Sequence, residues 1–163
     1  MPISALTNKM IAYPVITNFN ACESIDWAIE MITLGYENEN ILILAGLSKP
    51  CNYFETIKYL NAALSELNLQ PKSGESGIVS YAHYLVSLIS SGSSIRRSLA
   101  EITDISIDTD SSNILFDFRL LNWAWGDLDY NKDYQHYWEG ADINNIEQIT
   151  IDVARQWLSV YSI

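Results

Sequence analysis

Three segments of the chain combine an Asn-x-x-Glu sequence with apolar residues that recur every three or four positions. This pattern is a capping box: the asparagine side chain accepts a backbone N–H at the start of a helix while the glutamate reaches back. The apolar stripe that follows is the face that the helix buries. The three pairs are Asn20 with Glu23, Asn52 with Glu55, and Asn144 with Glu147. They predict a helix over about 21–34, a second that ends near Asn68, and a terminal helix that reaches Tyr161.

Apolar periodicity predicts further helices between and before these three. Residues 41–47 are rich in β-branched residues, yet Glu37 and Glu39 before them suit the positive end of a helix dipole, so we expect a short helix there. The other expected segments are 5–19 with a kink at Pro14, 78–89 ended by Gly92, a helix opened by Ser93 or Ser94, and one from Asn113 that stops near Gly126. The prediction is an all-α chain of about seven or eight helices, packed as an irregular bundle or a short stack of helical hairpins.

The 163 residues are enough for one domain with a hydrophobic core of its own. A polar interval at 70–77 separates two apolar halves, each of which would form only a thin core alone. We therefore expect a single domain over 1–163, with 1–70 and 76–163 as subdomains joined by a polar connector.

Negative charge is concentrated in one part of the chain. The formal net charge is -11, and residues 101–152 contain 12 acidic residues but only two basic ones, Arg119 and Lys132. Nucleic acid is excluded as a direct partner because phosphate binding needs a surface rich in lysine and arginine. An acidic surface of this kind favours a basic protein partner.

The N-terminal sequence and the two cysteines predict a cytoplasmic protein that does not interact with membranes. Pro14 interrupts the first apolar stretch, so the pattern of a signal peptide is missing, and no run approaches the ~20 apolar residues of a membrane span. Cys22 and Cys51 lie 29 positions apart without neighbours at metal-ligand spacing. We expect them to be buried thiols, and we expect no metal or other cofactor.

Catalytic patterns are missing from the sequence. Its two histidines, His83 and His136, belong to no nucleophile, metal-protease or phosphate-binding motif, so we expect no catalytic residues and no enzymatic activity. The run Asp127-x-Asp129-x-Asn131-x-Asp133 copies the start of a calcium loop, but Lys132 stands where that loop needs glycine and Trp138 where it needs glutamate. A cation binder or small metal-dependent enzyme that uses this run is the alternative.

The segment 116–142 interleaves aromatic and acidic residues. One interpretation is a buried aromatic core with a solvated acidic rim. The other is a partner-binding face, because tyrosine and tryptophan dominate interface energetics and surrounding carboxylates steer a basic partner. A third is a homodimer built through the tryptophan-rich segment. The predicted partner-binding residues are Trp125, Asp127, Asp129, Asp133, Tyr134, Tyr137, Trp138, Glu139 and Asp142.

Several short motifs resemble those of a widespread group of small acidic bacterial proteins. These motifs are Trp27-Ala28, Gly35-Tyr36, Leu44-Ala-Gly-Leu47, Phe54-Glu55, Glu66-Leu67, Asp127-Leu128 and Tyr137-Trp138, and the similarity is strongest over 25–67. Some members of that group are regarded as immunity proteins encoded beside toxin genes. The resemblance implies an α-helical fold and a toxin as the basic partner, and it assigns no catalytic residue.

Overall fold

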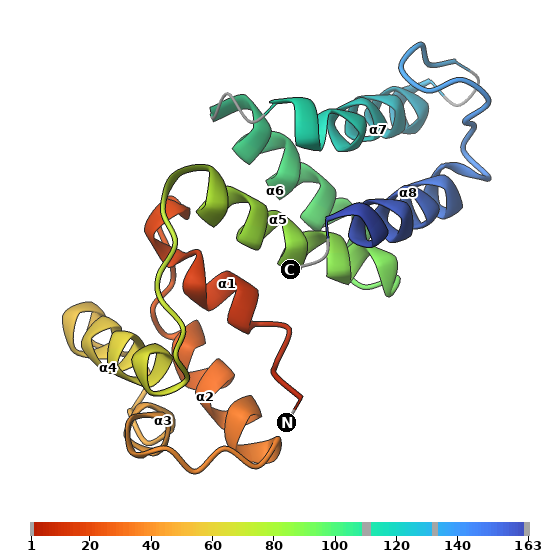
Figure 1. Cartoon of the computed structure of the whole chain (residues 1–163). Helices are drawn as coiled ribbons and strands as arrows, with labels where there is room; N and C mark the ends of the chain where they lie inside the picture. The colour runs from red at the N-terminus through yellow and green to blue at the C-terminus, as the bar shows by residue number, and fades with distance from the viewer. Residues whose placement is uncertain (1, 109–111, 132–133, 162–163) are drawn as a thin grey trace. The chain divides into compact units, whose positions relative to one another are not determined.

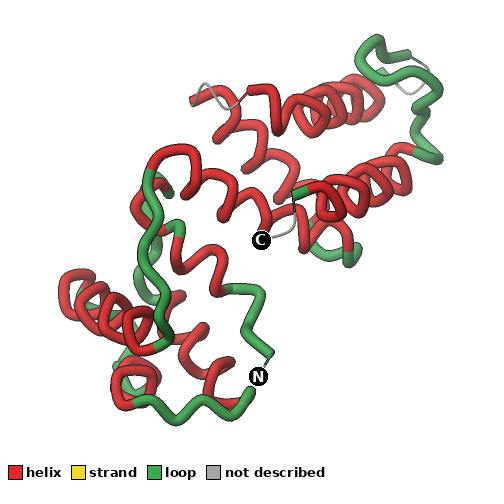
Figure 2. Tube along the Cα trace, viewed as in Figure 1, coloured by secondary structure: helices red, strands yellow, loops and turns green. Residues whose placement is uncertain are grey.

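A computed structural model describes residues 2–108, 112–131 and 134–161. Within these ranges the chain forms eight α-helices, one short 3-10 helix and no strand, so the prediction of an all-α fold is confirmed (Figure 1; Figure 2). None of the helices in these ranges is long and apolar enough to cross a membrane. In chain order the elements are α1 (Thr7–Ile11), η1 (Tyr13–Val15), α2 (Glu23–Thr33), α3 (Glu39–Ala45), α4 (Tyr53–Glu66), α5 (Gly74–Ser90), α6 (Ile95–Asp108), α7 (Ser112–Tyr130) and α8 (Ile146–Val160).

The chain divides into two compact units, Met1–Tyr81 and Ala82–Ile163, with the boundary inside α5. The polar residues from Gly74 onward form the first turn of this helix, so the predicted connector over 70–77 is wrong in its second half. Its first half is anchored within the first unit, because the Lys72 backbone N–H donates to the Ile11 carbonyl at 2.7 Å.

The first unit packs α2 against α3 and α3 against α4. Trp27 lies at the centre with no exposed surface, and its indole N–H donates to the Thr7 hydroxyl at 2.9 Å. This hydrogen bond satisfies the one polar group of a ring that is otherwise surrounded by apolar side chains. The buried cluster comprises Met10, Ile11, Phe19, Ala21, Trp27, Ala28, Met31, Ile41, Leu44, Leu60, Ala63 and Leu64.

One of the three predicted capping boxes has the expected asparagine cap. The Asn52 side chain accepts the Glu55 backbone N–H at 3.1 Å at the start of α4. At the first site the Asn20 side chain orders a turn before the helix instead, and at the third site Asp142 and Asn145 form that turn. The Asn20 side chain accepts the N–H of Cys22, which is itself the N-cap of α2, and α8 begins two residues after Asn144. Periodicity therefore located α2 and α8 correctly, although the N-caps predicted for these two helices were wrong.

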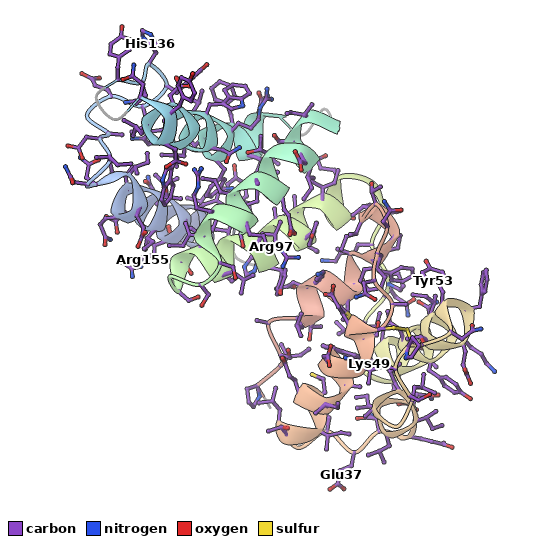
Figure 3. All side chains as sticks on the ribbon, turned by 180° about the vertical axis from the view of Figure 1, so that it is seen from behind. Glu37, Lys49, Tyr53, Arg97, His136 and Arg155 are labelled. Carbon is purple, nitrogen blue, oxygen red and sulfur yellow. A yellow bond between two sulfur atoms is a disulfide. The ribbon has the colours of Figure 1, made fainter. Side chains whose placement is uncertain are left out.

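The two cysteines form a disulfide, so the prediction of buried thiols is wrong. Cys22 at the start of α2 and Cys51 before α4 have Cα atoms 5.6 Å apart (Figure 3). Their separation of 29 residues concealed this proximity, because α2 and α3 first lead the chain away and then bring it back. Beside the disulfide, Lys49 pairs with Asp26 at 2.6 Å and further ties the loop before α4 to α2.

In the second unit α6 and α7 form an antiparallel hairpin, and α8 packs against α7. Trp157 of α8 donates its indole N–H to the Ile114 carbonyl at 3.0 Å and lies against the rings of Phe118 and His83. The prediction that this helix stops near Gly126 is wrong, because α7 continues for four more residues to Tyr130. This extra turn positions the candidate site.

Candidate partner-binding face

The last turn and a half of α7 carries three of the predicted partner-binding residues. Trp125 is only 8% exposed and belongs to the core of the second unit. Asp127 and Asp129 are exposed. Residues that are two positions apart in an α-helix differ by about 200° around its axis. The two carboxylates therefore point to different sides of α7.

Arg96, in the first turn of α6, contacts two of these residues. Its guanidinium lies over the Trp125 ring at 4.7 Å and pairs with the Asp129 carboxylate at 2.5 Å. The charge of Asp129 is therefore compensated within the unit. Among the described residues, no cation pairs with the carboxylate of Asp127.

The Gln135 side chain orders the first part of the loop between α7 and α8. The Gln135 amide oxygen accepts the backbone N–H groups of Tyr137 and Trp138 at 2.8 and 2.9 Å, and its NH₂ group donates to the Ala141 carbonyl at 3.1 Å. The ring of Tyr137 also packs on Trp123 of α7, with centroids 5.5 Å apart. These contacts fix this part of the loop beside the C-terminal half of α7 (Figure 1).

Asp142 helps to order the same loop. Its carboxylate accepts the backbone N–H groups of Asn144 and Asn145 at 2.7 and 3.0 Å, which is a local turn that asparagine and aspartate commonly form. The role of Asp142 in the structure is therefore to shape the approach to α8. Glu139 in the preceding turn is exposed, and no hydrogen bond or ion pair to its carboxylate is formed within the described residues.

Three tyrosines of the same stretch of chain are exposed. Tyr130 is 96% exposed, Tyr134 58% and Tyr137 41%, whereas Trp138 is half-buried. His136 lies at the outer end of the loop with its ring against Tyr134 (Figure 3). The predicted Asp133 lies outside the described residues. We call Asp127, Tyr130, Tyr134, Tyr137 and Glu139 the acidic tyrosine face.

A groove of about 470 Å³ opens beside this face. It is lined by Arg96, Asn122, Trp123, Gly126, Asp127 and Tyr137. It is a shallow depression that is open to solvent. Aromatic rings, one carboxylate, one amide and the Arg96 guanidinium in the lining give it both apolar and polar contacts.

The geometry gives the cation-binding alternative no support. Asp127 and Asp129 lie on a helix rather than on a calcium-type loop, and Asp129 is already paired with Arg96. Over the ranges that the structure describes, no three acidic, histidine or cysteine side chains gather around a common point that could hold a metal ion.

Sequence reasoning did not select four residues that line the groove: Arg96, Asn122, Trp123 and Gly126. Arg96 lies 33 positions before Asp129, and only the antiparallel pairing of α6 and α7 brings the two together. Asn122 and Trp123 could have been found from the four-residue spacing that places them one turn before Gly126 and Asp127, respectively. Comparison of the chain with models of protein families, with curated proteins and with solved structures found no match.

Proposed function

We propose that this chain is a non-enzymatic interaction protein, of the immunity type, which binds a basic protein partner through the acidic tyrosine face. The observation that carries the proposal is the coincidence of exposed tyrosines with carboxylates that the fold does not compensate. Tyr130 and Tyr134 expose large aromatic rings on the same stretch of chain as Asp127. Burial of such rings in a partner would supply affinity, and the carboxylates would supply orientation and association rate.

The position of Asp127 in its helix supports a role outside folding. Asp127 and Asp129 occupy the last turn of α7, which contains no basic residue. The partial negative charge of a helix C-terminus disfavours a nearby carboxylate by about 0.3–1 kcal/mol. Arg96 offsets this cost for Asp129, but within the described residues nothing offsets it for Asp127. Residues that oppose local stability are typical of functional sites.

The compartment belongs to this proposal as well. The expectation from the N-terminal sequence is the cytoplasm, whereas a disulfide between Cys22 and Cys51 is more typical of an oxidising compartment. An immunity-type protein works where its toxin arrives, so either compartment fits the proposed role. Thiol alkylation of cells before lysis, followed by mass spectrometry of the two cysteines, distinguishes the two.

The test measures binding of the products of the neighbouring genes by surface plasmon resonance at several salt concentrations. We expect a basic neighbour to bind with an association rate that falls as salt rises, because rim charges act over about 8–10 Å in physiological salt. The substitution Asp127→Lys should lower that rate by about tenfold, since it reverses a charge of the face that no basic residue compensates within the described residues.

Asp104→Lys is the matched control. Asp104 is also exposed and near the C-terminus of a helix, but it lies on α6, eight residues beyond Arg96 and therefore about 12 Å from it along the axis. Both variants change the net charge equally. If they weaken binding equally, or if no neighbouring product binds, the acidic tyrosine face is not the interface.

A further inference from the structure

Gly126 is one of the residues that line the groove beside the acidic tyrosine face. Gly126 lies inside α7, and a Cβ atom added there would meet no other heavy atom within 4 Å. A longer side chain at this position would enter open space at the groove, outside the packed pair of Trp123 and Tyr137. The groove is therefore a specific local feature, removable by one substitution that causes no steric clash.

The charges in the groove leave one carboxylate free to bind a cation. Arg96 lines the groove, but its guanidinium is already engaged by Asp129 at 2.5 Å and by the Trp125 ring at 4.7 Å. Asp127 has no such partner among the described residues. The uncompensated charge of this part of the lining is therefore that of one carboxylate, which lies beside two aromatic rings.

The same unit already shows which group fits such surroundings. Arg96 stacks on Trp125 while it pairs with an aspartate, and the Arg119 guanidinium lies 5.0 Å from the Trp123 ring and 5.9 Å from Phe116. A guanidinium suits these surroundings because it is planar and weakly hydrated, and because it donates two parallel hydrogen bonds to a carboxylate. Lysine, as a compact and strongly hydrated charge, fits them less well.

We infer that the groove receives an arginine side chain of the basic partner, with its guanidinium paired to Asp127 beside the rings of Trp123 and Tyr137. This inference rests on the proposed function, because it names the chemistry by which the acidic tyrosine face recognises its partner. It also assigns a purpose to Gly126 within α7, since that glycine keeps the groove open. An arginine that fills a central pocket is a common anchor of protein interfaces.

The inference can be tested without the partner, with small probes and the full chain. N-acetyl-arginine amide, N-acetyl-lysine amide and the neutral isostere N-acetyl-citrulline amide are titrated into ¹⁵N-labelled protein. The signals of interest are the Trp123 indole N–H and the Gly126 backbone N–H. We expect the arginine probe to shift both signals saturably, the lysine probe to bind about threefold or more weakly, and the citrulline probe to cause no saturable shift.

Three variants locate the binding. Asp127→Asn should weaken binding of the arginine probe by about two- to fivefold, the range for a partly exposed ion pair. Gly126→Leu should abolish binding because its side chain fills the groove. Asp104→Asn, on α6, should leave binding unchanged. Equal binding of arginine and lysine would overturn the assignment of a guanidinium, and the same affinity in Gly126→Leu would overturn the assignment of the groove.

The results separate this inference from the proposed function. A partner that depends on Asp127 for its association rate, together with an arginine probe that causes no shift, leaves the acidic tyrosine face intact and refutes the arginine site. An arginine probe that binds in the groove, together with a partner that is indifferent to Asp127→Lys, refutes the proposed function of the face.

Discussion

Replacement of Gly126 by alanine should make the protein more stable. The glycine lies inside α7, four residues before the helix ends at Tyr130, and it is exposed. Glycine is unfavourable inside a helix because its backbone loses more conformational freedom on folding than that of any other residue. A methyl group at this position would lie in open space, since no heavy atom is within 4 Å of it. The substitution therefore removes the entropic cost without adding a clash.

The expected gain is about 0.5–1 kcal/mol, toward the lower end because the last turn of a helix is less constrained than its middle. For a chain of this length it corresponds to a rise of roughly 1–4 °C in the melting temperature. Urea denaturation followed by circular dichroism measures the change directly. The slope against urea should stay constant, because the exposed area of the unfolded chain hardly changes.

The matched control is the same substitution at Gly140. A Cβ atom at Gly140 would also meet nothing within 4 Å, but this residue has a φ of +77°, where alanine is strained. Gly140→Ala should therefore destabilise the protein by about 1 kcal/mol, opposite in sign to Gly126→Ala. If both variants change stability in the same direction, the free space around Gly126 and the conformational argument do not account for its effect.

Three other predictions concern the two cores. Cys22→Ala with Cys51→Ala opens a loop of 29 residues and should lower the free energy of unfolding by about 3.6 kcal/mol relative to the oxidised parent, measured by urea denaturation. The reduced parent is the control and should have the same free energy of unfolding as the variant. Thr7→Val leaves the indole N–H of Trp27 without its acceptor in the core, at a cost of about 1–3 kcal/mol; a loss below 0.5 kcal/mol would mean that water replaces the hydroxyl. Burial lowers the pKa of His83, so the contribution of this residue to stability is complete above the unfolded pKa of 6.5 and is lost as the pH falls below that value. His83→Gln should therefore make the urea midpoint depend less on pH below 6.5. Identical pH profiles for the parent and the variant would contradict this prediction.

Helix positions were predictable from the sequence because they depend on short-range periodicity. The apolar residues that recur every three or four positions predicted the starts of α2, α4 and α8 within two or three residues of where the structure has them. The errors occurred where a local signal competes with packing. Gly126 resembles a helix stop, but Trp125 and Leu128 on either side of it are buried, and this packing carries α7 one turn further. Burial outweighs the intrinsic preference of one glycine.

Long-range pairs were not predictable in the same way. Neither the disulfide between Cys22 and Cys51 nor the contact of Arg96 with Asp129 leaves a mark in the local sequence, since each depends on how two helices turn back on one another. The composition of the candidate face was visible in its aromatic and acidic residues. Which of them are buried, paired or free followed only from the fold.

The total charge of the second unit is therefore a poor guide to how a partner would be recognised. Asp129 is neutralised by Arg96, and Asp142 is occupied by two backbone N–H groups of its own loop. Both contribute to the long-range field that attracts a basic protein, but each already has one oxygen, Oδ2 of Asp129 and Oδ1 of Asp142, in a contact within the unit. Asp127 and Glu139 have no such engagement within the described residues, so a partner can pair with them at no cost in existing contacts. Charge reversal at Asp129 should consequently affect the stability of the hairpin of α6 and α7, whereas charge reversal at Asp127 should affect binding.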